Sequence, residues 1–234
     1  MMPSTLDKII GHLQHSEKLQ HKTHTLGLTE RLRELQSWQT KRLLVTYDDM
    51  WQSRRFRPAM QFFIEELYGP KDFSQRDQDI ARVVPKMAKL LPEQALQSLE
   101  AALRLNSLSH EMDLSLTENI HQGPICAETY AQAYRLCNNR PQREEQIQLL
   151  AGLGSDLADV VKIKGISALL MISRKPAKLA GVESLHSFLE DGYKAFKKLG
   201  EVDAFISPII IRETALMVAL FDESQPNPLP DFPS

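Results

Sequence analysis

The sequence predicts an all-α fold: a single-domain multi-helix bundle of seven to nine helices, with an apolar C-terminal helix near the centre. Three observations predict this class. Apolar residues recur three or four positions apart along most of the 234-residue chain, which is the repeat of amphipathic helices. Apolar residues make up 42% and charged residues 25% of the chain, the balance of a globular protein. Proline and glycine stand between the periodic stretches, where one helix ends and the next begins.

We expect one domain over residues 1–222, followed by a Pro-rich acidic tail over residues 223–234. A chain of 234 residues is long enough to bury a substantial core. The first helix, within residues 1–27, is largely polar, so we expect it to be loosely attached. The second runs from residue 29 to about 51. Basic and acidic residues alternate along it, which is typical of a salt-bridged surface.

A sharp corner between two helices is predicted at Gly69. This glycine can adopt the left-handed conformation that closes a helix, and Pro70 cannot continue one. The helix that begins at Pro58 therefore ends at Tyr68. The next helix begins at Ser74, whose hydroxyl can cap the first turn.

Charged and aromatic side chains gather at this corner. Arginine side chains carry planar donors that match carboxylates, so we expect ion pairs that fix the angle between the helices. The alternative is a polar pocket that binds an anionic ligand or performs acid–base chemistry, since clustered titratable groups perturb one another. An arginine and a glutamate of the last helix also need partners when buried, and we expect those partners at the corner. The candidate polar cluster comprises Tyr68, Asp72, Arg76, Asp77, Arg82, Arg212 and Glu213.

Residues 62–77 read FFIEELYGPKDFSQRD, in the pattern FFxxELYGPxDFxxRD. The stretch 180–196 and the Arg212-Glu213 pair extend the match, so that it covers about residues 43–221. With these motifs the sequence resembles a family of helical bacterial proteins that has no assigned function. The resemblance implies an all-helical fold and brings no activity, cofactor or partner with it.

Further helices are predicted between the corner and the C-terminus. Their apolar repeats span residues 93–120, 125–136, 142–161, 184–199 and 203–221, and turn-forming residues separate them. The stretch 166–174 is strongly apolar, so we expect it to be buried.

The last of these helices is apolar nearly all round, the composition of a helix that others surround. We therefore place it near the centre of the bundle. Arg212 and Glu213 interrupt it, so it falls short of the roughly 20 uninterrupted apolar residues of a membrane span. The N-terminus lacks the basic start and apolar core of a signal peptide, which favours a cytoplasmic location.

The net charge of −2 gives no general attraction to nucleic acid or to an anionic membrane. Binding of either would need a local basic patch. Residues 162–198 carry a basic excess that either marks a face for an acidic partner or is neutralised by acidic residues after position 201. The basic residues are Lys162, Lys164, Arg174, Lys175, Lys178, Lys194, Lys197 and Lys198. Cys126 and Cys137 lie about 16 Å apart along one predicted helix, too far for a disulfide.

Two Glu-x-x-His pairs are weak metal candidates: Glu118 with His121, and Glu183 with His186. This spacing recurs in di-iron helical bundles, where both side chains project from one helix face. No matching carboxylates are identifiable on other helices, so we assign no metal, and the cofactor is unknown. The sequence has no Gly-x-Ser-x-Gly elbow, phosphate-binding loop or CxxC motif. We assign no catalytic residue and lean away from an enzyme.

Two functions from different classes follow. The first is a non-enzymatic cytoplasmic helical protein that acts through protein–protein interaction or as a homo-oligomer, which the uneven charge distribution favours. The alternative is a helical bundle that binds a small ligand, an anion or a metal, with or without catalysis, through the corner cluster or the Glu-x-x-His pairs. Nucleic-acid binding ranks below both, and we expect no membrane association.

Overall fold

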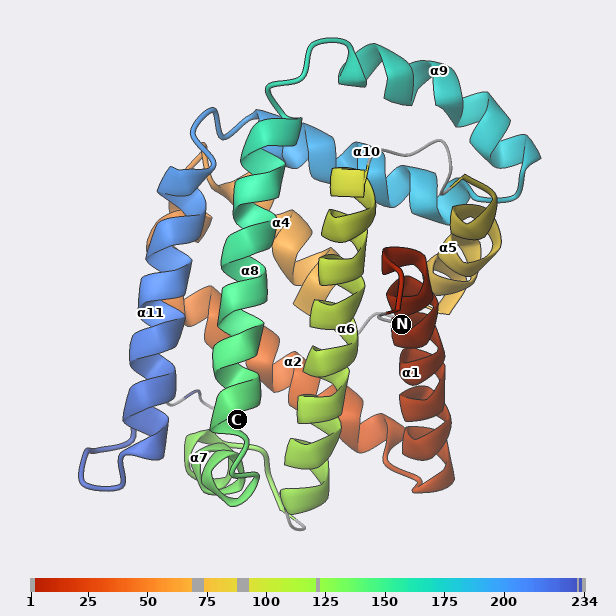
Figure 1. Cartoon of the computed structure of the whole chain (residues 1–234). Helices are drawn as coiled ribbons and strands as arrows, with labels where there is room; N and C mark the ends of the chain where they lie inside the picture. The colour runs from red at the N-terminus through yellow and green to blue at the C-terminus, as the bar shows by residue number, and fades with distance from the viewer. Residues whose placement is uncertain (1–2, 69–73, 88–92, 121–122, 231, 233–234) are drawn as a thin grey trace.

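The computed structural model describes residues 3–68, 74–87, 93–120, 123–230 and 232. Within these ranges every regular element is a helix and none is a strand, so the all-α prediction is confirmed (Figure 1). The elements are α1 (Thr5–Thr25), α2 (Thr29–Thr46), α3 (Asp48–Gln52), α4 (Arg57–Phe63), the π-helix η1 (Ile64–Tyr68), α5 (Ser74–Met87), α6 (Glu93–Asn119), α7 (Ala127–Leu136), α8 (Arg140–Val160), α9 (Ile166–Leu179), α10 (Glu183–Lys197) and α11 (Asp203–Phe221).

The predicted number of seven to nine helices is too low, because the described residues contain eleven α-helices. The predicted second helix divides at Tyr47 into α2 and α3. Residues 166–174, which we predicted to be buried without predicting a helix, form part of α9. The break at Tyr47 has no glycine or proline in the sequence to mark it.

The two long helices α6 and α8 run side by side through the middle of the bundle (Figure 1). Helix α1 packs along α6 on one side, and α11 packs along α8 on the other. Helix α2 crosses behind them, and α10 crosses one end of the bundle with α9 above it (Figure 1). The short α7 lies at the opposite end, near the C-terminus (Figure 1).

The N-terminal helix, for which we expected a loose attachment, is packed against the bundle. Ser4 caps it: the Asp7 amide donates to Ser4 Oγ at 3.2 Å, and the Ser4 amide donates to Asp7 Oδ2 at 3.0 Å. Ile9 and Leu13 are buried in a cluster with Ile80 and residues of α6. Helix α1 is therefore part of the core and can contribute to a site.

Helix α11 lies at the side of the bundle, so the prediction of a central position is wrong (Figure 1). Phe205 and Met217 are buried on its inner face, whereas Ile211 is 68% exposed and Val218 46% exposed on its outer face. Apolar composition on all sides does not reveal whether a neighbour covers each side. Among the described residues, α11 is the one helix whose length and composition would allow it to cross a membrane.

Helix α9 contradicts the expectation that residues 166–174 are buried, because it contains no buried residue. Among the described residues, no ion pair joins the acidic C-terminal region to the basic stretch around α9. Glu213 pairs with Arg42, and Glu223 lies 3.6 Å from Arg135. The tail lies at the α7 end of the molecule, where Leu229 is buried, far from α9 (Figure 1).

Candidate functional site

Two ion pairs of the described corner residues lie within helix α5, and a hydrogen bond from Arg82 joins α5 to the loop before α10. Arg76 Nη2 lies 3.2 Å from Asp77 Oδ1, and both side chains are buried. Arg82 pairs with Asp79 at 3.1 Å and donates to the carbonyl of Gly181. Asp72, the side chain of Tyr68 and the Gly69 turn itself lie outside the described residues.

Arg212 and Glu213 are paired as the sequence predicts, but not with the corner. Arg212 donates two hydrogen bonds of 2.7 Å to the carboxylate of Asp49 in α3. Glu213 accepts hydrogen bonds from Arg42 of α2 and, at 2.7 Å, from the hydroxyl of Tyr47. The predicted cluster is therefore divided between two regions of the molecule.

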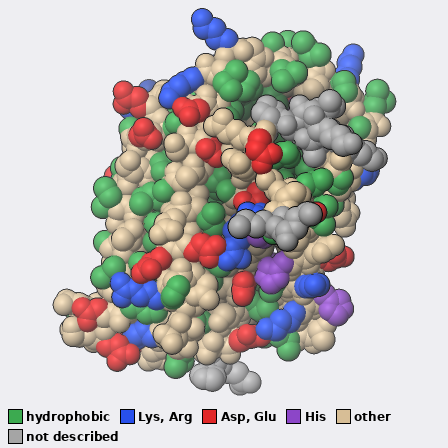
Figure 2. Space-filling view, in the orientation of Figure 1, with side chains coloured by type: hydrophobic (Ala, Val, Ile, Leu, Met, Phe, Trp, Pro, Cys, Tyr) green, Lys and Arg blue, Asp and Glu red, His purple; other side chains and the backbone are tan. Residues whose placement is uncertain are grey.

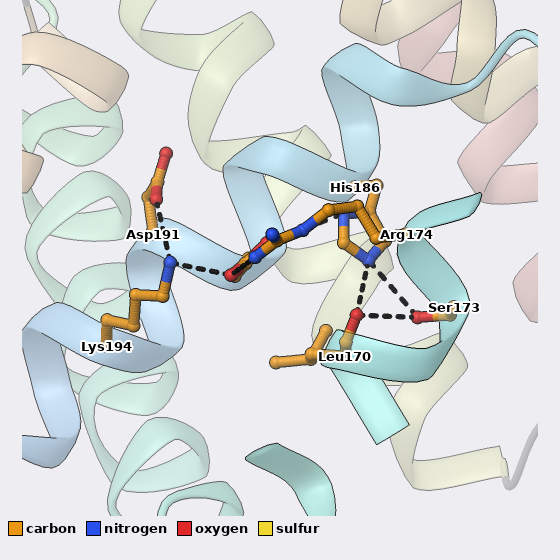
Figure 3. Close-up of polar contacts among 7 residues, drawn as sticks. Leu170, Ser173, Arg174, His186, Asp191 and Lys194 are labelled. Carbon is orange, nitrogen blue, oxygen red and sulfur yellow. Dashed lines mark hydrogen bonds and ion pairs between the residues drawn. The ribbon is translucent and has the colours of Figure 1, made fainter. Parts of the chain in front are cut away.

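The metal candidates do not form a site among the described residues. Glu118 lies 2.8 Å from Lys22 Nζ, Glu183 is exposed, and His121 lies outside the described residues. His186 is buried, with Nε2 2.9 Å from the Leu170 carbonyl and 3.1 Å from Ser173 Oγ (Figure 3). No group of three or more His, Cys, Asp or Glu side chains in the described ranges could hold a metal ion.

An internal cavity of about 340 Å³ lies between α1, α2, α6, α7, α8 and α11. Of the predicted polar cluster, Glu213 is the member among the described residues that lines it; Arg76, Arg82 and Arg212 do not. The cavity opens beside the α1–α2 turn, where its lining residues His24 and Arg33 are exposed. Histidine and basic side chains gather on this part of the surface, at the lower right of Figure 2.

The walls of the cavity differ in chemistry. Helix α6 contributes a wholly polar wall of residues three or four positions apart: Asn106, Ser109, His110 and Asp113. Helix α11 contributes Leu216, Met217 and Leu220 next to Glu213, and the tail adds Leu229. A molecule that fits both walls carries a polar group and an apolar body.

Arg143 is the main charged group of the cavity. It stands in the first turns of α8, after the Asn139 N-cap, and is only 7% exposed. Its guanidinium carbon lies 4.6 Å from the centre of the Tyr134 ring. Its Nε and Nη2 have no hydrogen-bond partner in the described part of the chain. A buried guanidinium with unused donors is costly, and the positive end of the α8 dipole adds to the attraction for an anion.

Asp113 lines the same cavity and only partly offsets the charge of Arg143. Its carboxylate accepts hydrogen bonds from Gln39 at 2.9 Å and from Gln36 at 3.5 Å. Burial raises the pKa of Asp113, although those hydrogen bonds and the nearby Arg143 act in the opposite direction. Burial and the charge of His15 lower the pKa of His110, which favours the neutral imidazole.

The other charged groups of the cavity interior compensate each other. Burial lowers the pKa of Arg42, but Glu213 outweighs this effect and raises it overall, so Arg42 stays charged beside Glu213. The Tyr47 hydroxyl donates a further hydrogen bond to Glu213. Arg143 thus carries the positive charge of the cavity interior that has no ion pair among the residues the structure describes.

Sequence reasoning missed Arg143 and Asp113. Arg143 stands in the charged run RPQREEQ, which reads as a solvent-exposed helix start. A signal was present in α6, where polar residues recur with the spacing of a helix face that also carries buried leucines. Such a face indicates a polar cavity only when a second polar face, here that of α8, lies opposite.

Comparisons with known proteins give a family but no activity. A family model described as "Domain of unknown function (DUF8198)" matches residues 18–228. The match contains every cavity-lining residue except Ser16 and Leu229. No curated protein and no solved structure matches the chain.

Proposed function

The chain belongs to this family of unknown function, and we propose that it is a binding protein for a small organic anion, a carboxylate with an apolar body. The cavity beside Arg143 is the binding site. Arg143 is nine-tenths buried, lines the cavity and has two donor nitrogens without a partner in the described residues. This single observation carries the proposal.

A carboxylate matches these donors in charge and geometry. The planar guanidinium presents parallel N–H groups, so one carboxylate can accept two of them. The stacked ring of Tyr134 holds the guanidinium in one orientation before a ligand arrives. A fixed donor pair reduces the entropy lost on binding.

The apolar wall accounts for the second part of the ligand. Leu216, Met217 and Leu220 offer hydrocarbon surface, and burial of apolar area contributes about 25 cal/mol per Å². Inorganic phosphate satisfies Arg143 but leaves that wall uncovered. An organic carboxylate satisfies both.

A thermal-shift comparison tests the proposal. We expect benzoate and hexanoate to raise the melting temperature by about 2–4 °C at tenfold excess over their dissociation constants, and benzamide and hexanamide to have much smaller effects. The Arg143→Met variant should lose the carboxylate effect. Arg104→Met is the matched control, because Arg104 pairs with Glu145 outside the cavity. Equal shifts for acids and amides, or an unchanged shift in Arg143→Met, would contradict the proposal.

Association with a protein partner or a second copy is a second candidate function, and the outer face of α11 favours it. Ser207, Ile211, Thr214 and Val218 are exposed at helical spacing without a charge among them. Native mass measured over a range of concentrations tests this candidate. A dimer that Ile211→Asp abolishes supports it, and a monomer at all concentrations counts against self-association. The two free cysteines support a reducing, cytoplasmic setting for either function.

A further inference from the structure

Helix α9 is held on the molecule mainly by polar contacts. Arg174 pairs with Glu190 of α10, and Lys194 Nζ lies 2.6 Å from the same carboxylate (Figure 3). These contacts with Lys194 and Arg174 lower the pKa of Glu190 to about 2, so it stays ionised at neutral pH. The buried His186 adds contacts to the Leu170 carbonyl and to Ser173 (Figure 3).

The outward side of α9 combines an apolar sector with a basic one. At 3.6 residues per turn, Leu169, Ile172 and Leu179 fall on one side, and Lys175 and Lys178 fall beside them. Ile172 is 70% exposed and Leu179 is 89% exposed. The apolar sector is large for a surface helix, since single exposed apolar residues are common but contiguous groups are not.

The charged residues of α9 and its flanking turns all have one sign. Residues 160–182 contain five basic residues and no acidic one. Arg174 is neutralised by Glu190, and Lys162 pairs with Asp159 at 3.3 Å. Lys164, Lys175 and Lys178 have no ion pair within the described residues. This is the local basic patch that binding to an anionic surface requires.

We propose that α9 is an interfacial helix that lies flat on an anionic lipid membrane. Its leucine and isoleucine side chains would enter the boundary between headgroups and acyl chains, while the lysines would contact the acidic headgroups. Protein interfaces are depleted in lysine and enriched in aromatic residues and arginine. The exposed face of α9 has three unpaired lysines around it and no aromatic residue, so a lipid surface fits it better than a protein.

The position of α9 suits this role. It lies above α10 at one end of the molecule, with no other helix above it (Figure 1). Hydrophobic side chains and a few separate basic ones lie at this end in Figure 2, with acidic side chains at its left. The cavity opens elsewhere, beside α1 and α2, so membrane binding and carboxylate binding are independent.

Vesicle co-sedimentation of the full chain tests the proposal. We expect binding to vesicles with about 30% phosphatidylserine, little binding to pure phosphatidylcholine, and a strong decrease at high salt. Lys175→Glu/Lys178→Glu should weaken binding at least about tenfold, since each lysine near the surface contributes several-fold. Ile172→Ser/Leu179→Ser should weaken it as well.

Matched controls separate this surface from exposed residues elsewhere. Lys41→Glu and Val45→Ser change exposed residues on α2, and both variants should bind as the wild type does. The proposal is overturned if vesicles do not bind the protein, or if the α9 and control variants bind equally. A dimer in solution that Ile172→Ser/Leu179→Ser abolishes, without vesicle binding, would assign the face to a second copy instead.

Discussion

Arg143 stacks on the ring of Tyr134 at 4.6 Å, and the contact fixes the guanidinium without using its hydrogen-bond donors. A second arginine of the same cavity, Arg42, is bonded to Glu213 and has its charge balanced. The two residues share burial and residue type but differ in their partners. This difference distinguishes a structural arginine from one that is available to a ligand.

Replacement of each arginine by methionine should therefore affect stability in opposite directions. In anion-free buffer, Arg143→Met should raise the free energy of unfolding by roughly 1 kcal/mol, because removal of unsatisfied buried donors outweighs loss of the ring contact. Arg42→Met should lower it by about 3 kcal/mol, because Glu213 is left without its cation. Urea unfolding measures both values. If Arg143→Met instead lowered the free energy of unfolding by several kcal/mol, Arg143 would have a stabilising partner in the folded protein, and its donors would not be free for a ligand.

The Arg42–Glu213 pair should act as a unit. Glu213→Leu alone leaves the guanidinium unpaired and should cost about 3 kcal/mol. In the double variant Arg42→Met/Glu213→Leu both charges are absent, and most of that loss should be recovered. A double-mutant cycle measured by urea unfolding should give a coupling energy larger than either single loss, because the double variant loses less stability than each single variant does. Additive losses would show that the two side chains do not interact.

Asp113 should make stability depend on pH in a defined direction. Burial raises its pKa in the folded protein above the ordinary value of 3.8, so folding favours the protonated form. The stability that protonated Asp113 contributes to the folded protein is fully present below pH 3.8 and is lost as the pH rises through the raised pKa. Relative to Asp113→Asn, the wild type should therefore become less stable across this range and then remain at a constant difference.

The quantity to measure is the difference in free energy of unfolding between the wild type and Asp113→Asn. Carboxylates such as Glu145 have lowered pKa values, so they make both proteins more stable as the pH rises, and this effect cancels in the difference. Urea unfolding at steps between pH 3.5 and 7 gives this difference. At a pH above the raised pKa of Asp113, Asp113→Asn should also bind benzoate more tightly, since a negative charge then leaves the cavity. Parallel stability curves for the two proteins would contradict the raised pKa.

Two glycines of α8 should respond differently to alanine. A Cβ at Gly154 would lie 2.7 Å from two side-chain carbons of Ile206, where α8 crosses α11. Gly154→Ala should cost about 1–3 kcal/mol through overpacking. At Gly152 a Cβ meets nothing within 4 Å, so Gly152→Ala should stabilise by about 0.5–1 kcal/mol. Thermal or urea unfolding compares the two, and equal effects would contradict the close approach at Gly154.

Local features of the fold could be predicted from the sequence, whereas long-range features could not. Helical periodicity and breakers predict the helices, because both act over a few residues. The position of α11 depends on how many neighbours cover it, and its outer face carries large apolar residues such as Ile211, as its inner face does. The same reason explains why α9 is exposed although its sequence is apolar.

The candidate site shows the same limit. The sequence predicts that Arg212 and Glu213 are paired, because buried charges need partners, but it does not predict that Asp49 and Arg42 provide them. Arg143 and Asp113 are 30 positions apart and meet only because α6 and α8 lie side by side. The motif at residues 62–77 is the most distinctive stretch of the sequence and predicts a polar cluster at the corner. The cavity instead lies between α1, α2, α6, α7, α8 and α11.

The central claim is that Arg143 receives a carboxylate, and its side-chain NMR signal tests this most directly. The ¹H–¹⁵N correlation of the arginine Nε–Hε groups, recorded during a benzoate titration, resolves Arg143 once Arg143→Lys identifies its signal. We expect the Arg143 signal to shift in a saturable way while that of Arg104 stays fixed. An Arg143 signal that does not move while benzoate stabilises the protein would place the anion elsewhere and contradict the claim.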